Sequence, residues 1–437
     1  MKNRYLIVLI STILSVNTSF GQDTLTISRD DILSKISQEN LQVKIAEKTF
    51  ESAKADYNQS RSLFLPNVSV SHTAILTTNP LMAFGSKLNQ QILTPSDFNP
   101  DLLNNPDKID NYSTAIEVQQ PIFNLDGVYE RKAAKTKMQA YQLQAERTKE
   151  YIKLEVSKAY MQLQMAYSAV KVLEKANATS EASLQLVENY FKQGMLQKTD
   201  LLSVQVRANE VKNQLQYANS NVKNASDYLA FLLNEENSTV IYKPAEELAS
   251  DIELKIFDTS LSEARKDIMA IDLSTQAYEN MLQSSKMKFL PRLNAFGSYL
   301  MNDDRLFQMG AGGYLVGAQL SWNLFDGYKS IGKMEKQKVE FQKAQVESTQ
   351  YKSQSQLEIN KTHRQLRDAY NKVNLSKLAL EQSREAYRIR SDRFQQGLEK
   401  TTDLLQSETQ MIQKELEILQ AVFEYNFTQQ YLEFLTK

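Results

Sequence analysis

The sequence predicts a mainly α-helical protein with a small β part, in which long coiled-coil helical hairpins are joined to four strands of transmembrane length. Three observations support this fold class. Only 8 prolines and 12 glycines occur in 437 residues, and they leave the stretches 128–193 and 333–396 without a chain breaker. Apolar residues recur with a period of 3.5 over 152–173 and over 201–229. In two zones richer in proline and glycine, 66–127 and 291–332, the period changes to two.

The composition excludes several classes of function. The chain carries 51 Lys and Arg against 52 Asp and Glu, which argues against a nucleic-acid partner. The absence of cysteine excludes a disulfide framework, a Cys-ligated zinc site, a thiol nucleophile and a lipid anchor on an N-terminal cysteine. The two histidines, His72 and His363, stand beside no recognisable nucleophile or metal-ligand spacing, and no phosphate-binding glycine loop occurs. We therefore expect no enzymatic activity, no catalytic residue, no metal site and no cofactor.

Residues 1–21 have the pattern of a secretory signal peptide. Lys2 and Arg4 precede an apolar stretch over 5–16, and small residues stand at the two positions that signal peptidase reads before a cut at Gln22. The apolar stretch is shorter than the roughly 20 residues that a membrane-spanning helix needs. The mature chain is therefore expected outside the cytoplasm, and if it crosses a membrane it does so with strands.

The breaker-free stretches carry the apolar spacing of coiled coils. Apolar residues alternate steps of three and four over 152–173 and again over 201–229, and the many alanines among them allow helices to approach closely. A seam that persists for four heptads predicts helices packed along their length. The seam residues are Ile152, Val156, Ala159, Leu163, Ala166, Val170 and Leu173 in the first stretch, and Leu201, Val204, Ala208, Val211, Leu215, Ala218, Val222, Ala225 and Leu229 in the second.

Four segments of about ten residues alternate between apolar and polar positions, as tilted transmembrane strands do. They are 67–76, 113–123, 292–301 and 314–324. A closed barrel needs at least about eight strands, so one chain cannot close a barrel and an oligomer is expected. Helix-to-strand junctions are predicted at Pro66, Pro121 and Pro291, and membrane-interface aromatic residues at Phe64, Phe123, Phe289, Trp322 and Phe325.

The two halves of the chain match each other, with 189–202 corresponding to 392–405 at an offset of 203. Such an internal repeat indicates a duplicated supersecondary unit. We divide the mature chain into a first repeat, 22–234, a linker or equatorial segment, 235–260, and a second repeat, 261–437. Each repeat is predicted to contain a helix, two strands (66–123 and 291–325), a long helix (127–193 and 328–396) and a return helix (199–234 and 401–434).

A tight turn is predicted between each long helix and its return helix. Gly194 and Gly397 are expected to end the long helices, because a left-handed backbone costs glycine nothing. Thr199 and Thr402 are expected to cap the N-terminal ends of the return helices.

The order of these motifs resembles the TolC-like outer-membrane efflux protein family, the outer membrane factors. The resemblance rests on Phe-Leu-Pro before a strand in each half, on the strand exit Phe325-Asp326-Gly327, and on paired turns in which Phe-x-x-Gly is followed after five residues by Asp-Leu-Leu. It covers essentially the whole mature chain. The first strand exit departs from the pattern, because extra residues separate Phe123 from Asp126-Gly127.

The resemblance implies a homotrimer with a 12-stranded barrel in the outer membrane and a helical tunnel in the periplasm. It implies export of small molecules or proteins from an inner-membrane transporter through a periplasmic adaptor, and contact with outer membrane lipid. The alternative is a periplasmic coiled-coil adaptor or a structural protein without a pore. An adaptor would have one helical hairpin rather than two, and a bare coiled coil would lack the four strands.

The resemblance also implies a gate at the turns, because acidic residues just after them line the closed periplasmic mouth. Asp200 and Asp403 match two such positions, whereas an arginine of one well-known member of the family would fall on Glu399, beside Lys400. The other interpretation is that both aspartates only favour the positive N-terminal end of a helix. The predicted gate residues are Gly194, Asp200, Gly397, Glu399, Lys400 and Asp403.

Two connections between strands complete the prediction. The stretch 79–112 holds four prolines and many Asn and Asp residues, and is expected to be an irregular extracellular loop. Its counterpart in the second half is 302–313.

Overall fold

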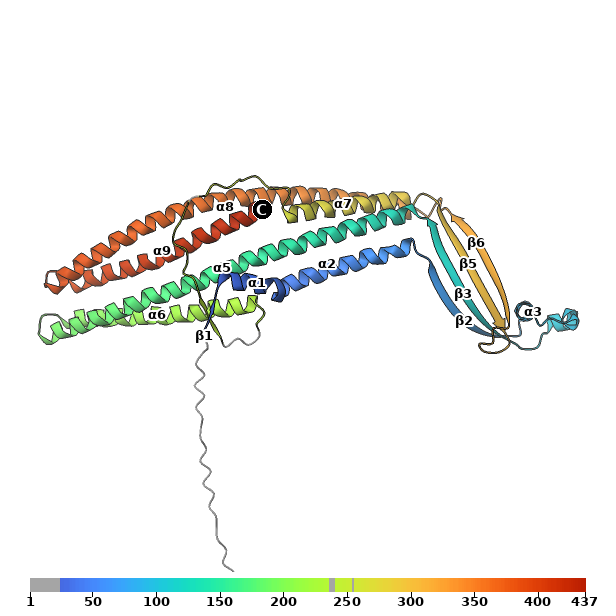
Figure 1. The fold of residues 1–437 in the computed structure, drawn as a ribbon, viewed down its shortest axis with the longest axis horizontal. Helices are drawn as coiled ribbons and strands as arrows, with labels where there is room; N and C mark the ends of the chain where they lie inside the picture. The colour runs from blue at the N-terminus through green and yellow to red at the C-terminus, as the bar shows by residue number, and fades with distance from the viewer. Residues whose placement is uncertain (1–23, 236–239, 254) are drawn as a thin grey trace, which may run out of the picture. The chain divides into compact units, whose positions relative to one another are not determined.

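The computed structural model describes residues 24–235, 240–253 and 255–437, so the predicted signal peptide lies outside the described residues. Helices dominate this part of the chain and strands form a smaller part, which confirms the predicted fold class (Figure 1). Among the described residues, no helix is both long and apolar enough to cross a bilayer. In chain order the elements are β1 (Thr24–Ile27), α1 (Arg29–Glu39), α2 (Leu41–Gln59), the 3-10 helix η1 (Ser60–Leu63), β2 (Asn67–Thr77), α3 (Pro80–Asn89), the 3-10 helix η2 (Pro95–Phe98), α4 (Pro100–Asn104), β3 (Ile109–Phe123), α5 (Leu125–Lys192), α6 (Lys198–Leu232), β4 (Ile241–Pro244), α7 (Lys266–Met287), β5 (Arg292–Asp303), β6 (Ala311–Ser321), α8 (Lys329–Gln395) and α9 (Thr401–Thr436).

The chain forms two compact units. Of the described residues, the first contains 24–41, 153–235, 240–253, 255 and 365–430, and the second contains 42–152, 256–364 and 431–437. The first unit holds the turns of both hairpins, and the second holds the strands β2, β3, β5 and β6.

Most of the seam positions predicted in the sequence are buried in the helices that carry them, and the others are half-buried: Ala166, Leu201, Ala208, Leu215 and Ala225. Val156, Ala159 and Leu163 of α5 are almost fully buried, as are Val204 and Val211 of α6. Burial of one stripe along helices of this length supplies the apolar contact that stabilises a coiled-coil-like bundle.

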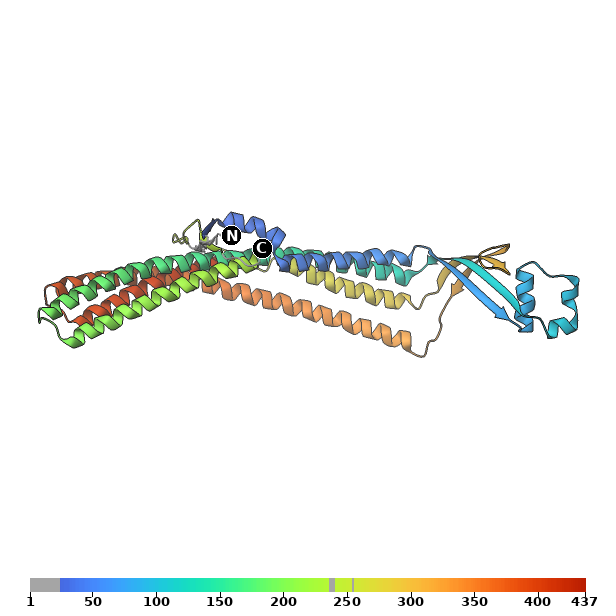
Figure 2. The same cartoon turned by 90° about the horizontal axis from the view of Figure 1, so that it is seen from below.

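A four-stranded antiparallel sheet in the order β2-β3-β5-β6 forms within the described part of the second unit (Figures 1 and 2). β3 pairs with β5, so the hairpin of the first repeat joins that of the second directly. The register shifts between Pro121 and Phe123, where proline has no N–H to give to the ladder. β2 and β6 are the outer strands, and each has one side without a partner strand in the described sheet.

The segment between β2 and β3 is not the irregular loop that the sequence predicted, because it contains α3, η2 and α4. The side-chain oxygen of Asn79 accepts a hydrogen bond from the backbone N–H of Met82 at 3.2 Å, and Pro80 opens α3. Asn99 and Pro100 start α4 in the same way. A proline in the first turn has a backbone angle already suited to a helix and lacks only an N–H that would stay unpaired there. These prolines therefore begin helices instead of preventing them.

The two strand exits have different geometries, and β6 ends at Ser321, before the predicted limit of 324. In the second exit Gly327 and Tyr328 have left-handed backbone angles φ of +68° and +66°, and α8 begins only at Lys329. In the first exit β3 passes almost directly into α5. The Asn124 side chain accepts a hydrogen bond from the backbone N–H of Gly127 at 3.2 Å and so starts the helix.

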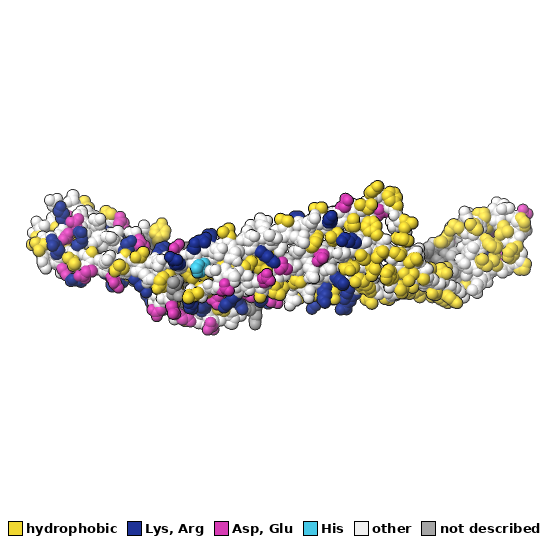
Figure 3. Space-filling view, turned by 90° about the horizontal axis from the view of Figure 1, so that it is seen from above, with side chains coloured by type: hydrophobic (Ala, Val, Ile, Leu, Met, Phe, Trp, Pro, Cys, Tyr) yellow, Lys and Arg dark blue, Asp and Glu magenta, His cyan; other side chains and the backbone are white. Residues whose placement is uncertain are grey.

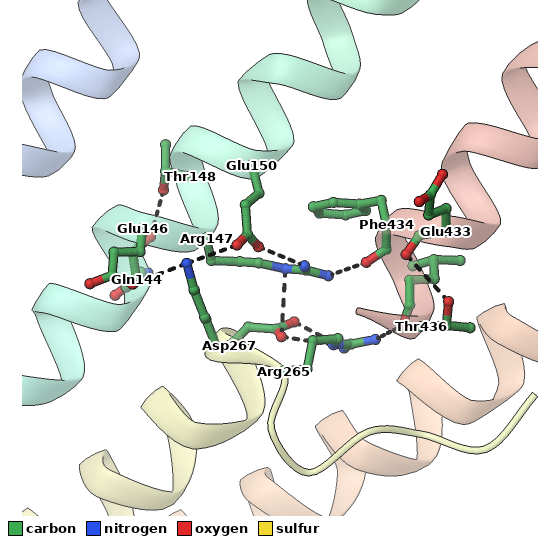
Figure 4. Close-up of polar contacts among 12 residues, drawn as sticks. Gln144, Glu146, Arg147, Thr148, Glu150, Arg265, Asp267, Glu433, Phe434 and Thr436 are labelled. Carbon is green, nitrogen blue, oxygen red and sulfur yellow. Dashed lines mark hydrogen bonds and ion pairs between the residues drawn. The ribbon is translucent and has the colours of Figure 1, made fainter. Parts of the chain in front are cut away.

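Two buried arginines hold the C-terminal end of α9, an arrangement that the sequence did not predict (Figure 4). Arg265 donates to the carbonyl oxygen of Leu435 at 2.8 Å, and Arg147 donates to that of Phe434 at 2.9 Å. The Arg147 guanidinium also lies over the Phe434 ring, 3.6 Å from its centre. Asp267 compensates the charge of Arg265 through hydrogen bonds of 2.7 and 2.9 Å. Arg147 forms ion pairs with Glu150 at 3.0 Å and with Asp267 at 3.6 Å. The last carbonyls of the helix, which lack partners within it, are thus satisfied.

Candidate functional site

The two hairpin turns share one backbone geometry. Gly194 and Gly397 have φ angles of +73° and +72°, in the left-handed region. After the first turn, the N–H of Met195 bonds to the carbonyl of Tyr190 at 2.9 Å, and after the second, Leu398 bonds to Arg393 at the same distance. This is the hydrogen-bond pattern of a Schellman cap, which satisfies the last carbonyls of each long helix.

The return helix α6 begins at Lys198, one residue before the predicted limit of 199, and α9 begins at Thr401. The predicted caps Thr199 and Thr402 therefore lie inside the helices. Asp200 caps the first return helix in place of Thr199, because its carboxylate accepts a hydrogen bond from the backbone N–H of Gln197 at 3.1 Å. This cap lies at the N-terminal end of α6, where an anion also suits the helix dipole.

The second turn carries an ion-pair network centred on Glu399. Its two carboxylate oxygens bind Arg390 at 3.1 Å and Arg393 at 3.0 Å, and only 14% of its side chain is exposed. Arg390 also lies 3.9 Å from Asp403. Lys400 is exposed, and its carbonyl accepts the N–H groups of Asp403 and Leu404 at 3.2 Å. This turn therefore has an acid held between two arginines.

The first turn lacks this network. At the repeat offset of 203, the positions of Arg390, Arg393 and Glu399 are occupied by Val187, Tyr190 and Leu196. In the described part of the chain, Asp200 forms no ion pair with a Lys or Arg side chain. The two turns therefore have the same backbone but different electrostatics.

An apolar cluster connects the two hairpins beside their turns, where Figures 1 and 2 show the tips side by side. Its buried members are Val187 of α5, Val204 of α6, Phe394 of α8 and Leu404 of α9. The Tyr190 hydroxyl adds a 3.4 Å hydrogen bond to the carbonyl of Gln395. We call Val187, Val204, Phe394 and Leu404 the tip cluster. Contact across hairpins was not predicted, because the seam pattern places residues on a helix face without naming the opposite helix.

A buried acid lies one turn beyond the tip cluster. Glu408 of α9 is 1% exposed, and its Oε1 has no hydrogen-bond partner within the described chain. Burial raises the pKa of Glu408, although the charge of Arg207 acts in the opposite direction. The spacing in the sequence could have predicted this burial, because Glu408 follows Leu404 by four residues and so lies on the same face of the helix.

The predicted junction and interface residues gather at the end of the sheet that adjoins the helices. Pro66 and Pro291 directly precede β2 and β5, whereas Pro121 lies within β3. The indole N–H of Trp322 donates to the carbonyl of Phe289 at 2.9 Å. All the predicted interface aromatic residues are exposed to different degrees: Phe64, Phe123, Phe289, Trp322 and Phe325.

The profile of the outer membrane efflux protein family matches residues 32–235 and 259–436, which is most of the chain and both repeats. The chain belongs to this family. The resemblance inferred from the sequence is thereby confirmed. This outer membrane efflux protein is located in the outer membrane. The family match favours an efflux channel over the alternative of an adaptor or a structural coiled coil, and it is a family of transport proteins rather than enzymes.

Solved structures of the same fold support this assignment. A membrane protein from Pseudomonas aeruginosa has a TM-score of 0.81 at 15% identity, over 94% of this chain and 92% of that one. The CmeC outer membrane channel of Campylobacter jejuni has a TM-score of 0.81 at 16% identity, over 93% and 85%. The outer membrane protein VceC of Vibrio cholerae has a TM-score of 0.78 at 16% identity, over 93% and 96%. No match to a curated protein was found.

Proposed function

We propose that three copies of this efflux protein form one channel, which receives small molecules or proteins from an inner-membrane pump through a periplasmic adaptor. The observation that carries the proposal is the four-stranded sheet with two open outer strands. Three such sheets give twelve strands, an even number within the range of outer-membrane barrels.

The outer strands need partners from other copies. The exposed side chains of β2 and β6 include large apolar residues, such as Val70 at 68% and Val316 at 74% exposure. Such side chains suit lipid, but the backbone N–H and C=O groups at an open edge would stay unpaired in a bilayer at a cost of several kcal/mol each. Pairing β6 of one copy with β2 of the next removes every open edge.

A cross-linking experiment tests this arrangement, since the chain has no native cysteine. Val70→Cys and Ala318→Cys each lie three residues from the junction end of an outer strand. With a flexible thiol cross-linker, the double variant is expected to give a ladder that ends at three chains. Each single variant, and Val70→Cys combined with Ala295→Cys on the inner strand β5, should stay monomeric in denaturing gels. A ladder that ends at two chains would contradict the trimer.

We further propose that the hairpin turns form the gate and the docking end for the adaptor. The supporting feature is the charge at the turns, where Asp200, Glu399, Lys400 and Asp403 lie within one helical turn of the hairpin ends. Exposed ion pairs are worth only about 0–1 kcal/mol each. A partner that binds the open tips better can therefore reverse closure without an energy source in this chain.

A further inference from the structure

Basic side chains gather at the four helix ends that meet the sheet. The segments 51–63, 125–137, 280–292 and 326–338 adjoin the strands, and together they hold 13 Lys and Arg against 6 Asp and Glu. The whole chain has 51 against 52, so this excess is local. All four segments belong to the second unit, and Figure 3 shows Lys and Arg side chains beside the hydrophobic surface of the strands. We call these basic residues the basic collar.

Most acidic side chains in these four segments already have a partner within the chain. Asp126 forms an ion pair with Arg292, and Glu130 forms one with Lys288 at 3.3 Å. Asp326 accepts the backbone N–H of Ser330 at 3.1 Å. The lysines differ, because most are exposed and have no ion pair within the described chain. These are Lys132, Lys135, Lys137, Lys286, Lys329, Lys333, Lys336 and Lys338.

The stability of the helices does not explain these lysines. Lys329 is the first residue of α8, where the helix dipole favours an acid over a base. Lys333 and Lys336 follow within two turns. Repulsion among uncompensated like charges on neighbouring turns also opposes folding. The cluster therefore indicates an external anionic partner.

A band of exposed apolar and aromatic side chains lies directly next to the collar. Leu324, Phe325 and Tyr328 precede α8, and Trp322 follows β6. At a bilayer interface, aromatic rings of this kind lie at headgroup level, and long basic side chains extend from apolar surface to the phosphate groups. A soluble anion would not require this apolar band, whereas a phospholipid surface matches both features.

We propose that the basic collar binds the anionic headgroups of phospholipids in the periplasmic leaflet of the outer membrane. This inference rests on the proposed function, which places the strands in the bilayer and the helices in the periplasm. Clusters of four to eight basic residues beside a transmembrane segment select anionic lipids by their charge. The collar then fixes the depth of the channel in the membrane and enriches anionic lipid around it.

Trp322 reports on the lipid at this position, because it is the only tryptophan in the sequence. The full-length protein is reconstituted in two bilayers of the same phosphatidylcholine and phosphatidylglycerol content. In one, the phosphatidylglycerol carries brominated chains, and in the other, an equal share of the phosphatidylcholine does. Brominated chains quench tryptophan fluorescence on contact. We expect the association constant of phosphatidylglycerol relative to phosphatidylcholine to be about fivefold at low salt, the effect of about one lysine per lipid. In about 1 M salt, charges are screened beyond about 3 Å, and the relative association constant should approach one.

Matched variants assign the effect to the collar. Replacing the four α8 lysines 329, 333, 336 and 338 with Gln is expected to reduce the relative association constant to near one at low salt. The control replaces four exposed lysines that lie outside the four collar segments and have no ion pair in the described chain: Lys153, Lys212, Lys223 and Lys361. This variant should keep the preference for phosphatidylglycerol. Gln retains helix propensity, so both variants are expected to fold.

The outcomes separate this inference from the proposed function. Equal quenching by both brominated lipids in the wild-type protein overturns the collar, while the strands remain in the bilayer. Quenching by neither lipid shows that Trp322 lies outside the bilayer, and this result overturns the proposed membrane placement as well. An equal loss of preference in the collar and control variants shows that total charge, not the collar, selects the lipid.

Discussion

Replacing Asp267 with Asn removes the carboxylate that compensates Arg265 at the C-terminal end of α9, whereas Arg147 keeps its ion pair with Glu150. Asp267 accepts two hydrogen bonds from Arg265, which is 2% exposed, and a third from the Tyr351 hydroxyl at 2.6 Å. Breaking a buried pair by removing one partner costs about 3–5 kcal/mol, because the remaining charge is left uncompensated. The Asp267 side chain is 17% exposed, so we take the lower value of about 3 kcal/mol, or about a 100-fold change in a local opening equilibrium.

Hydrogen exchange measured by mass spectrometry at pH 7 tests this value on the detergent-purified protein. Amides at the C-terminal end of α9 and in the first turn of α7 should exchange about 100-fold faster in the variant. Asp272→Asn is the matched control on the same helix, because Asp272 binds Lys352 at 2.9 Å with its side chain 49% exposed. That pair is worth about 0–1 kcal/mol. Equal acceleration in the two variants would refute the assigned role of the arginine cluster.

The same cluster predicts a dependence on pH. Burial alone would raise the pKa of Asp267, but hydrogen bonds from Arg265 and Tyr351, with the charges of Arg147 and Arg265, outweigh it and lower the pKa. The carboxylate is thus more acidic in the folded protein than in the unfolded chain. Its stabilisation is complete above the unfolded value of about 3.9 and is lost as the pH falls through the folded value. Acid should weaken protection of the α9 end in the wild type, whereas Asp267→Asn removes this dependence.

Three further predictions concern the hairpin turns. Replacing both Asp200 and Asp403 with Ala should raise ion conductance in planar bilayers while the trimer persists, and unchanged conductance would leave helix capping as their role. Glu399→Gln removes the charge between two arginines and should also raise conductance, which a wild-type value would contradict. Gly397→Ala strains a left-handed residue by about 1–2 kcal/mol and should speed amide exchange at the start of α9, whereas Gly332→Ala inside α8 should not.

The arrangement of long elements could be predicted from the sequence because local rules determine it. A stretch without proline or glycine and with a 3.5 period has few alternatives to a long helix, and α5 and α8 occupy the two longest stretches. The left-handed conformation of Gly194 likewise follows from its position after a periodic segment. The segment after Asn79 was predicted wrongly, because proline was interpreted only as a breaker, whereas Asn-Pro is also a helix start.

The arginine cluster and the tip cluster could not be predicted in this way. Arg265 and Leu435 are 170 residues apart, and no periodicity within either segment identifies the other. The Glu399 network was missed for a different reason. The resemblance to one family member led us to expect an arginine at position 399, whereas the arginines that bind Glu399 lie on the preceding helix.

If the hairpin turns form the proposed gate, the tip cluster determines which surfaces separate when it opens. Separating the hairpins within one chain would expose the tip cluster, Val187, Val204, Phe394 and Leu404, at about 1.5–3 kcal/mol for each large side chain. Breaking exposed ion pairs costs only about 0–1 kcal/mol each. We therefore expect the two hairpins of one chain to move together, so that the mouth opens between copies. In the Glu399→Gln variant, amides around the tip cluster should then keep their slow exchange while conductance rises. Fast exchange there would mean that opening separates the hairpins of each chain.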